Sequence, residues 1–107
     1  MLQLNLFPLA ETVHLRGATP VENFVHFHRT NPQVYRAFVT LALDHKSKGM
    51  PQWSAKSIFE ILRWSSMQTS GEAWKLNNDY HSHYARKAMR EIPALDGFFR
   101  TREMKVA

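Results

Sequence analysis

Apolar residues recur at three- and four-residue intervals in three segments of the chain, at about residues 32–47, 54–67 and 79–92. This spacing places them on one face of an α-helix, with charged residues on the opposite face. The apolar faces are predicted to consist of Val34, Tyr35, Phe38, Leu41 and Ala42 in the first segment, Ile58, Phe59, Ile61 and Leu62 in the second, and Tyr80, Tyr84, Ala85, Ala88, Met89 and Ile92 in the third. Three helices that share one hydrophobic core are therefore expected.

Capping residues mark the ends of the first two segments. Asn31, or Thr30, is suited to cap the first helix, because its side-chain oxygen can accept a free backbone N–H, and Pro32 suits the first turn. Gly49 is expected to end this helix in a left-handed conformation. Ser54 is a suitable N-cap for the second helix. These signals place the first helix at about 32–47 and start the second after Ser54.

The rest of the chain is short, irregular and punctuated by proline and glycine. Residues 1–23 are expected to form an N-terminal arm, and residues 24–107 a single helical domain. Residues 21–28 fit either a short helix or an extended lead-in, and residues 98–102 have enough β character for a short strand. This order of elements predicts a mainly α, three-helix winged-helix/helix-turn-helix-like domain with short β-like segments. The long connector at 67–79 also leaves open a plain helical bundle.

The charge of the chain favours an acidic partner. Fourteen Lys and Arg residues exceed nine Asp and Glu residues, for a formal net charge of +5. Residues 1–28 carry one base and two acids (net −1), whereas 29–74 carry six and three (net +3) and 75–107 carry seven and four (net +3). The basic excess thus coincides with the predicted helices, as in many proteins that bind nucleic acid.

Several function classes find no support in the sequence. The absence of cysteine excludes disulfides, thiol catalysis and cysteine-ligated metal. No nucleophile elbow, phosphate-binding loop or HExxH pattern occurs, so an enzyme is not expected, nor any cofactor. The pairs His26/His28 and His81/His83 do not chelate well at this spacing on a helix, and no metal site is predicted. Because the chain has neither a run of ~18 apolar residues nor a basic leader, a cytoplasmic protein without membrane contact is expected.

The third predicted helix carries the best candidate binding residues. Ser82, Arg86 and Arg90 follow one another at four-residue steps, and His83 and Lys87 flank them. Such a basic face suits the major groove, where Arg can bridge a guanine edge or a phosphate. The predicted nucleic-acid-binding residues are Ser82, His83, Arg86, Lys87 and Arg90, with Arg100 and Arg102 in the tail gripping the adjacent backbone. The alternative is an ordinary solvated helix face.

Two short motifs carry a resemblance. Lys75-Leu76-Asn77-Asn78 and Tyr84-Ala85-Arg86 are its most specific parts, and the match covers about residues 24–103. In these motifs the chain resembles a family of small, largely uncharacterised proteins encoded by bacteriophages and prophages. The resemblance implies a bacterial host cell and two kinds of phage protein, a DNA-binding regulator or a small inhibitor of a host enzyme or defence complex.

The resulting expectation is a winged-helix-like protein that binds double-stranded DNA, a phage or prophage regulator, as a monomer or homodimer. The alternative is a protein-interaction module that inhibits a host protein. Trp53, Trp64 and Trp74 are relevant to this alternative. At least two of them are expected to pack in or beside the core, and an exposed one would suit a protein interface.

Overall fold

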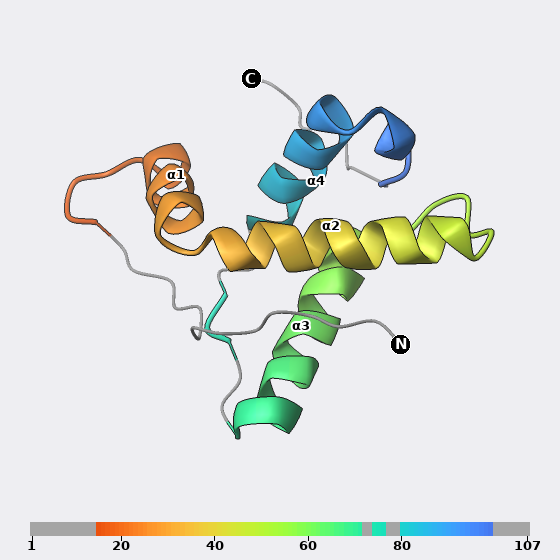
Figure 1. Cartoon of the computed structure of the whole chain (residues 1–107). Helices are drawn as coiled ribbons and strands as arrows, with labels where there is room; N and C mark the ends of the chain where they lie inside the picture. The colour runs from red at the N-terminus through yellow and green to blue at the C-terminus, as the bar shows by residue number, and fades with distance from the viewer. Residues whose placement is uncertain (1–14, 72–73, 77–79, 100–107) are drawn as a thin grey trace.

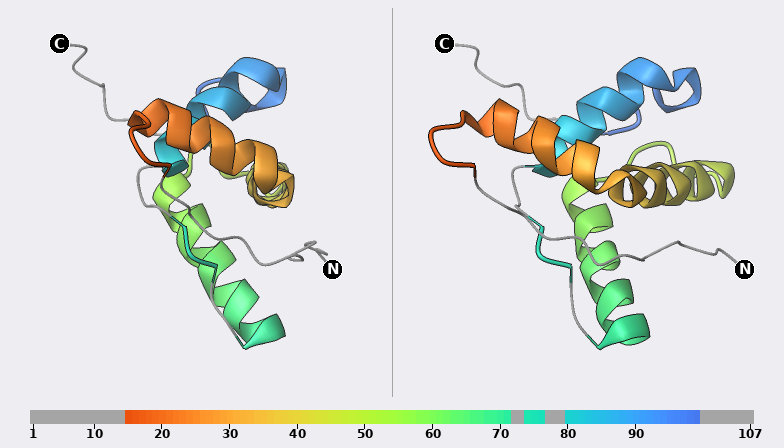
Figure 2. Two further views of the ribbon diagram at one scale, coloured as in Figure 1. Left: turned by 90° about the vertical axis from the view of Figure 1, so that its left-hand side faces the viewer. Right: turned by 60° about the vertical axis from the view of Figure 1, so that its left-hand side comes forward.

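Four α-helices and one short 3-10 helix build the protein. The computed structural model describes residues 15–71, 74–76 and 80–99 (Figure 1). The elements are α1 (Pro20–Thr30), α2 (Pro32–Ser47), α3 (Ala55–Ser70), α4 (Tyr80–Glu91) and the 3-10 helix η1 (Pro93–Leu95). Helix α2 crosses the middle of the molecule, with α1 and α4 on one side and α3 extending away on the other (Figures 1 and 2). The described part is therefore a compact all-α domain.

The three predicted helices are confirmed, and a fourth precedes them. Helix α2 has the expected bounds, and α4 agrees to within a residue at each end. Helix α3 runs past the predicted end at Met67 as far as Ser70, and the left-handed Gly71 (φ 82°) then stops it. The periodic apolar signal ends before Thr69, although threonine and serine cost a helix little when a glycine cap follows.

Helix α1 resolves the ambiguity of residues 21–28. The Thr19 hydroxyl accepts the backbone N–H of Glu22, and the Glu22 carboxylate accepts that of Thr19. This reciprocal capping box fixes the first turn, and Pro20 has the backbone angle that a first turn requires. Phe24 and Phe27 then anchor the helix on the core. Because α1 begins at Pro20, residues 20–23 of the predicted arm form its first turn, and residues 1–14 lie outside the described part.

Asn31 occupies the N-cap position of α2 as predicted, but the predicted side-chain capping hydrogen bond does not form. Its side chain makes no capping hydrogen bond to α2, and its Nδ2 instead donates to the carbonyl of Phe27 at 3.1 Å. Asn31 is the whole connection between α1 and α2, so its amide is already committed to the last turn of α1. Ser54, in contrast, accepts the N–H of Ser57 and caps α3 as predicted.

The predicted β-like segments do not form strands in the described residues. A parallel bridge pairs Trp53 with Phe99, and the Trp53 N–H donates to the Phe98 carbonyl at 3.0 Å. Phe98 and Phe99 are buried, so apolar packing rather than a sheet uses their side chains. Residues 100–102 of the predicted strand, which include the predicted binding residues Arg100 and Arg102, lie outside the described part.

The core lies where α2 meets α3 and α4. Its largest fully buried side chains are Phe27, Phe38, Ile58, Phe59, Leu62, Trp74, Tyr80, Tyr84, Leu95 and Phe98. Residues 74–76 pack along α3, since the N–H of Trp74 donates to the Ser66 hydroxyl at 2.8 Å and Arg63 donates to the Leu76 carbonyl at 2.9 Å. This packing leaves the outward side of α4, the end of α1 and the distal half of α3 to define the surface.

Candidate nucleic-acid interface

The five predicted binding residues of α4 do not form a freely exposed face. Ser82, His83, Arg86 and Lys87 are half-buried, and Arg90 is exposed. Tyr80, Tyr84 and Ala88 hold the helix on the core as predicted. The face of α4 that is predicted to bind nucleic acid is thus only partly exposed to solvent.

Aromatic contacts hold α1 against α4. The Phe24 ring stacks on the His83 ring with centroids 4.7 Å apart, and its edge meets Tyr84 at 4.9 Å. The ring of His28 packs edge-on against Tyr84 and Tyr35, at 5.6 and 5.4 Å. These contacts bring the C-terminal half of α1 beside the middle of α4.

Arg86 is oriented by this packing. Its Nη2 lies 3.2 Å from Nδ1 of His83. Because a guanidinium can only donate, His83 Nδ1 accepts this hydrogen bond and is unprotonated there. The stack between Phe24 and His83 therefore fixes the imidazole, and the imidazole fixes one edge of the guanidinium.

Glu91 closes a second group of contacts with Lys87 and Tyr35. Lys87 Nζ donates to one carboxylate oxygen at 2.6 Å, and the Tyr35 hydroxyl donates to the other at 2.9 Å. The ammonium also lies 5.3 Å from the centre of the Tyr35 ring, within range of a cation–π contact. The Lys87 hydrogen bond, above all, lowers the pKa of Glu91, with smaller contributions from the Tyr35 hydrogen bond and the charge of Arg90. Glu91 is therefore a carboxylate at neutral pH.

His28 lies neutral beside these charges. Its partial burial lowers its pKa, and the positive charge of Lys87 lowers it further against the opposing effect of Glu91. Burial likewise raises the pKa of the Tyr84 hydroxyl, which lies 3.4 Å from His28 Nδ1. At pH 7 the imidazole consequently contributes an apolar and hydrogen-bonding surface rather than a charge.

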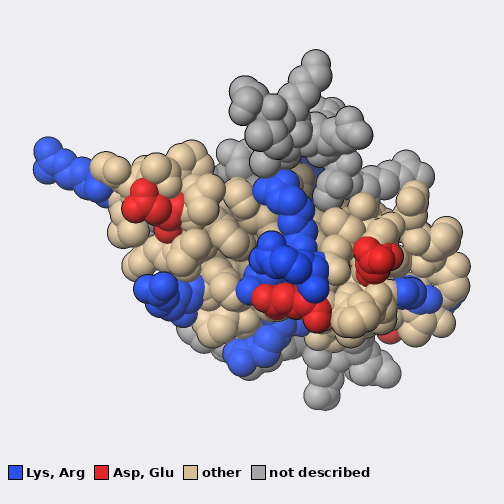
Figure 3. Space-filling view, turned by 90° about the horizontal axis from the view of Figure 1, so that it is seen from above, with Lys and Arg blue, Asp and Glu red and all other residues tan. Residues whose placement is uncertain are grey.

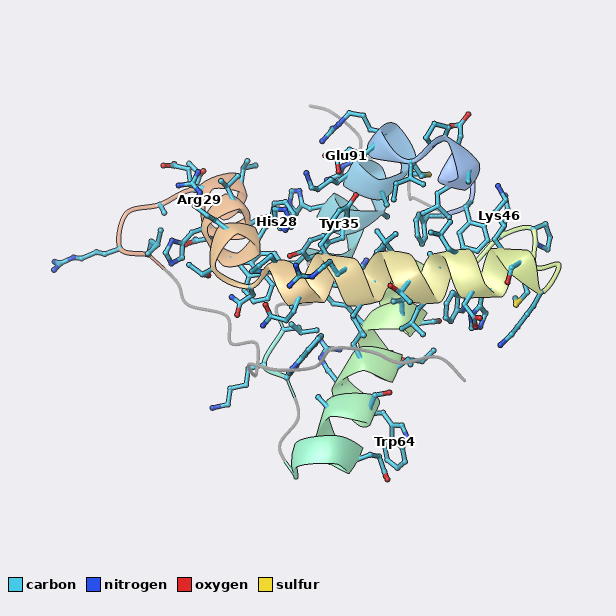
Figure 4. All side chains as sticks on the ribbon, in the orientation of Figure 1. His28, Arg29, Tyr35, Lys46, Trp64 and Glu91 are labelled. Carbon is cyan, nitrogen blue, oxygen red and sulfur yellow. The ribbon has the colours of Figure 1, made fainter. Side chains whose placement is uncertain are left out.

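Together these side chains form what we call the α1–α4 basic face. It consists of His28 and Arg29 from α1, Tyr35 from α2, and His83, Arg86, Lys87, Arg90 and Glu91 from α4. Arg29 and Arg90 are exposed and make no hydrogen bond or ion pair with any other described residue. Seen from above, Lys and Arg side chains form a band across the middle of the molecule, with one acidic group enclosed among them (Figure 3). His28, Tyr35 and Glu91 lie together in the angle between α1, α2 and α4 (Figure 4).

The predicted binding residues do not include four members of this face, namely His28, Arg29, Tyr35 and Glu91. The apolar periodicity predicts Tyr35 in the core, and no pattern in the sequence identifies His28, Arg29 or Glu91 as binding residues. The four-residue spacing of Lys87 and Glu91 does signal their ion pair. The contact of Tyr35 with Glu91 spans 56 residues, and no local pattern indicates it.

A second surface lies on the far side of the molecule. Trp64 and Met67 project from the distal half of α3, with 59% and 43% of their surface exposed, and form what we call the outer face of α3 (Figure 4). The other two tryptophans pack as expected. Trp74 is buried, and Trp53 stacks on His45 with ring centroids 3.5 Å apart.

The described residues contain neither a metal-binding group nor a membrane-spanning helix. No cluster of three or more His, Cys, Asp or Glu side chains occurs within residues 15–71, 74–76 and 80–99. None of the helices in these ranges has the length and apolar character that crossing a bilayer requires.

Fold and surface define a small all-α domain with a basic, aromatic-lined face and an exposed tryptophan opposite. Comparison of the chain with family models, with curated proteins and with solved structures found no match. The phage-family resemblance of the Lys75–Asn78 and Tyr84–Arg86 motifs remains a prediction.

Proposed function

We propose that this chain is a nucleic-acid-binding protein that grips the sugar–phosphate backbone with its α1–α4 basic face. One observation carries the proposal: α4 presents Arg86, Lys87 and Arg90 together, with Glu91 paired to Lys87, and the exposed Arg29 of α1 adds a fourth cation. Phosphate contacts from Arg and Lys supply most of the affinity of non-specific nucleic-acid binding. The half-exposed rings of His28, Tyr35 and His83 add flat surfaces of the kind that nucleotides pack against.

The proposed mode differs from a free recognition helix. In a winged-helix or helix-turn-helix reading, α2, α3 and α4 would form the three-helix unit, and α4 would enter the major groove of double-stranded DNA. His83 and Lys87, however, are engaged by Phe24, Tyr35 and Glu91, which limits how far α4 can penetrate a groove. Backbone contact by the arginines is compatible with this packing. Such a protein would suit a phage or prophage regulator that reads duplex shape more than sequence.

A salt series tests the proposal directly. Fluorescence anisotropy with a labelled random-sequence duplex should show an affinity that falls steeply with salt, because each phosphate contact releases a counterion. Changing Arg29 or Arg90 to glutamine should each reduce the slope of log K against log salt by about 0.9. Lys56→Gln removes the same charge from exposed α3 and is the matched control. Absence of binding at low salt, or equal losses in all three variants, would contradict the proposal.

A second candidate function rests on the exposed Trp64. Tryptophan is a favoured anchor of protein interfaces, and Met67 extends the apolar surface beside it. If the chain inhibits a host enzyme or defence complex, tagged protein should retain a partner from host lysate after nuclease treatment. Trp64→Ala should release that partner, whereas Arg90→Gln should retain it. Loss of all partners on nuclease treatment favours the nucleic-acid function instead.

A further inference from the structure

The Glu91 carboxylate occupies a ready-made set of anion-binding groups. It accepts hydrogen bonds from Lys87 Nζ and from the Tyr35 hydroxyl, and the Arg90 guanidinium is close enough to lower its pKa. Ammonium, phenol and guanidinium groups also donate hydrogen bonds to phosphate oxygens. The groups come from two helices, and α1 supports them through His28, whose ring packs against Tyr35. A carboxylate of the chain itself thus lies where an external anion would find two donors, with the charge of Arg90 nearby.

We infer that Lys87 and Tyr35 form a phosphate-binding subsite, and that Glu91 fills it until a phosphate group displaces its carboxylate. Displacement requires little rearrangement of the fold, because Glu91 is the last residue of α4 and 42% of its side chain is exposed. Exposed side chains change rotamer in picoseconds to nanoseconds, so the carboxylate can swing out without unfolding the helix. Glu91 then acts as an internal competitor that weakens nucleic-acid binding.

The inference rests on the proposed function for its macromolecular ligand, although the subsite chemistry suits any phosphate. Glu91→Gln removes the competing charge while it retains the size of the side chain. Duplex affinity should rise about threefold or more at low salt, because one phosphate contact changes affinity by roughly that factor between 50 and 200 mM salt. The slope against salt should also steepen by about 0.9. The side chain at position 91 is uncharged in this variant, so Lys87 loses its ion pair and is available to the ligand.

Glu60→Gln provides the matched control. Glu60 is exposed on α3, which extends from α2 on the side opposite α1 and α4 (Figure 1), and its replacement changes net charge by the same amount. A general charge effect would raise affinity equally in both variants, whereas the subsite predicts a gain confined to Glu91→Gln. Tyr35→Phe in the Glu91→Gln background should cancel part of the gain, because it removes one donor. Thermal melts of each variant establish that the fold is retained.

Titration with inorganic phosphate separates the subsite from the nucleic-acid function. In Glu91→Gln, phosphate should shift the NMR signals of Tyr35 and Lys87, and chloride at equal ionic strength should not. Phosphate shifts without duplex binding would support the subsite and contradict the proposed function. Duplex binding that Glu91→Gln leaves unchanged, weakens, or raises no more than Glu60→Gln would overturn the inference and leave the proposed function standing. No response to either ligand in any variant would overturn both.

Discussion

Phe24 is the side chain that should decide whether α1 is an integral part of the fold. Its ring is 8% exposed and contacts His83, Tyr84, Tyr80 and His28. Truncation of a buried phenylalanine costs about 3–5 kcal/mol, a range that includes the cavity left behind. Because Phe24 lies at the rim of the core, we expect Phe24→Ala to cost about 3 kcal/mol, at the lower end of that range. For a domain of this length the loss corresponds to a fall in Tm of about 12 °C.

Urea denaturation followed by circular dichroism measures this loss, and Val25→Ala is the control. Val25 follows directly on α1 but is 44% exposed, so its truncation should change the free energy of unfolding by less than about 0.5 kcal/mol. A loss below about 1 kcal/mol for Phe24→Ala would refute the reasoning, because the aromatic stack would then not hold α1 against α4. In that event α1 would not be held against α4, and the basic face would lose the residues that α1 contributes.

Three further predictions concern pH, a helix end and the tryptophans. The lowered pKa of His28 means that the unfolded chain binds its proton more readily than the folded one, so stability should fall as pH drops through about 6.5; urea titrations at pH 7.5 and 5.5 should show the loss, and His28→Asn should reduce it. Gly71→Ala should lower stability by about 1 kcal/mol in the same assay, since φ is 82° there although the space around it is open. Trp74→Ala should cost about 3–5 kcal/mol and Trp64→Ala almost none, because only the first is buried; similar losses would contradict the assignment of Trp64 to the surface.

Local sequence signals were sufficient to predict α2, α3 and α4, but not the contacts of the residues that connect the helices. Pro32 and Gly49 bracket α2 within the sequence, and its bounds follow from them. Asn31 shows the limit of such rules, because an asparagine between two helices can serve either of them. Its amide binds the Phe27 carbonyl, and that choice depends on the angle between α1 and α2, which no local pattern contains. The strand prediction at residues 98–99 was wrong for a related reason. Two adjacent phenylalanines have β propensity, but here both side chains are buried in the core.

The basic residues of α4 could be identified from the sequence, whereas the contacts of the acidic residue Glu91 could not. A helical wheel of residues 79–92 identifies Arg86, Lys87 and Arg90, because the spacing of basic residues is a local property. Whether those charges are available depends on what packs beside them. Glu91 forms an ion pair with Lys87, and the hydroxyl of Tyr35, from α2, donates a hydrogen bond to the same carboxylate.

The charge that a basic helix offers to a partner is therefore smaller than its sequence suggests. On the α1–α4 basic face, the four cations Arg29, Arg86, Lys87 and Arg90 less the one carboxylate of Glu91 leave a net +3 in the resting arrangement. Displacement of Glu91 by a phosphate leaves this sum unchanged but moves the negative charge of the chain out of contact with Lys87. The exchange substitutes one anion for another, so binding at this subsite should depend less on the total charge of the protein than on the donors that Tyr35 and Lys87 hold in place. A duplex would then gain affinity from Arg29 and Arg90, which it meets unpaired, before it gains any from Lys87.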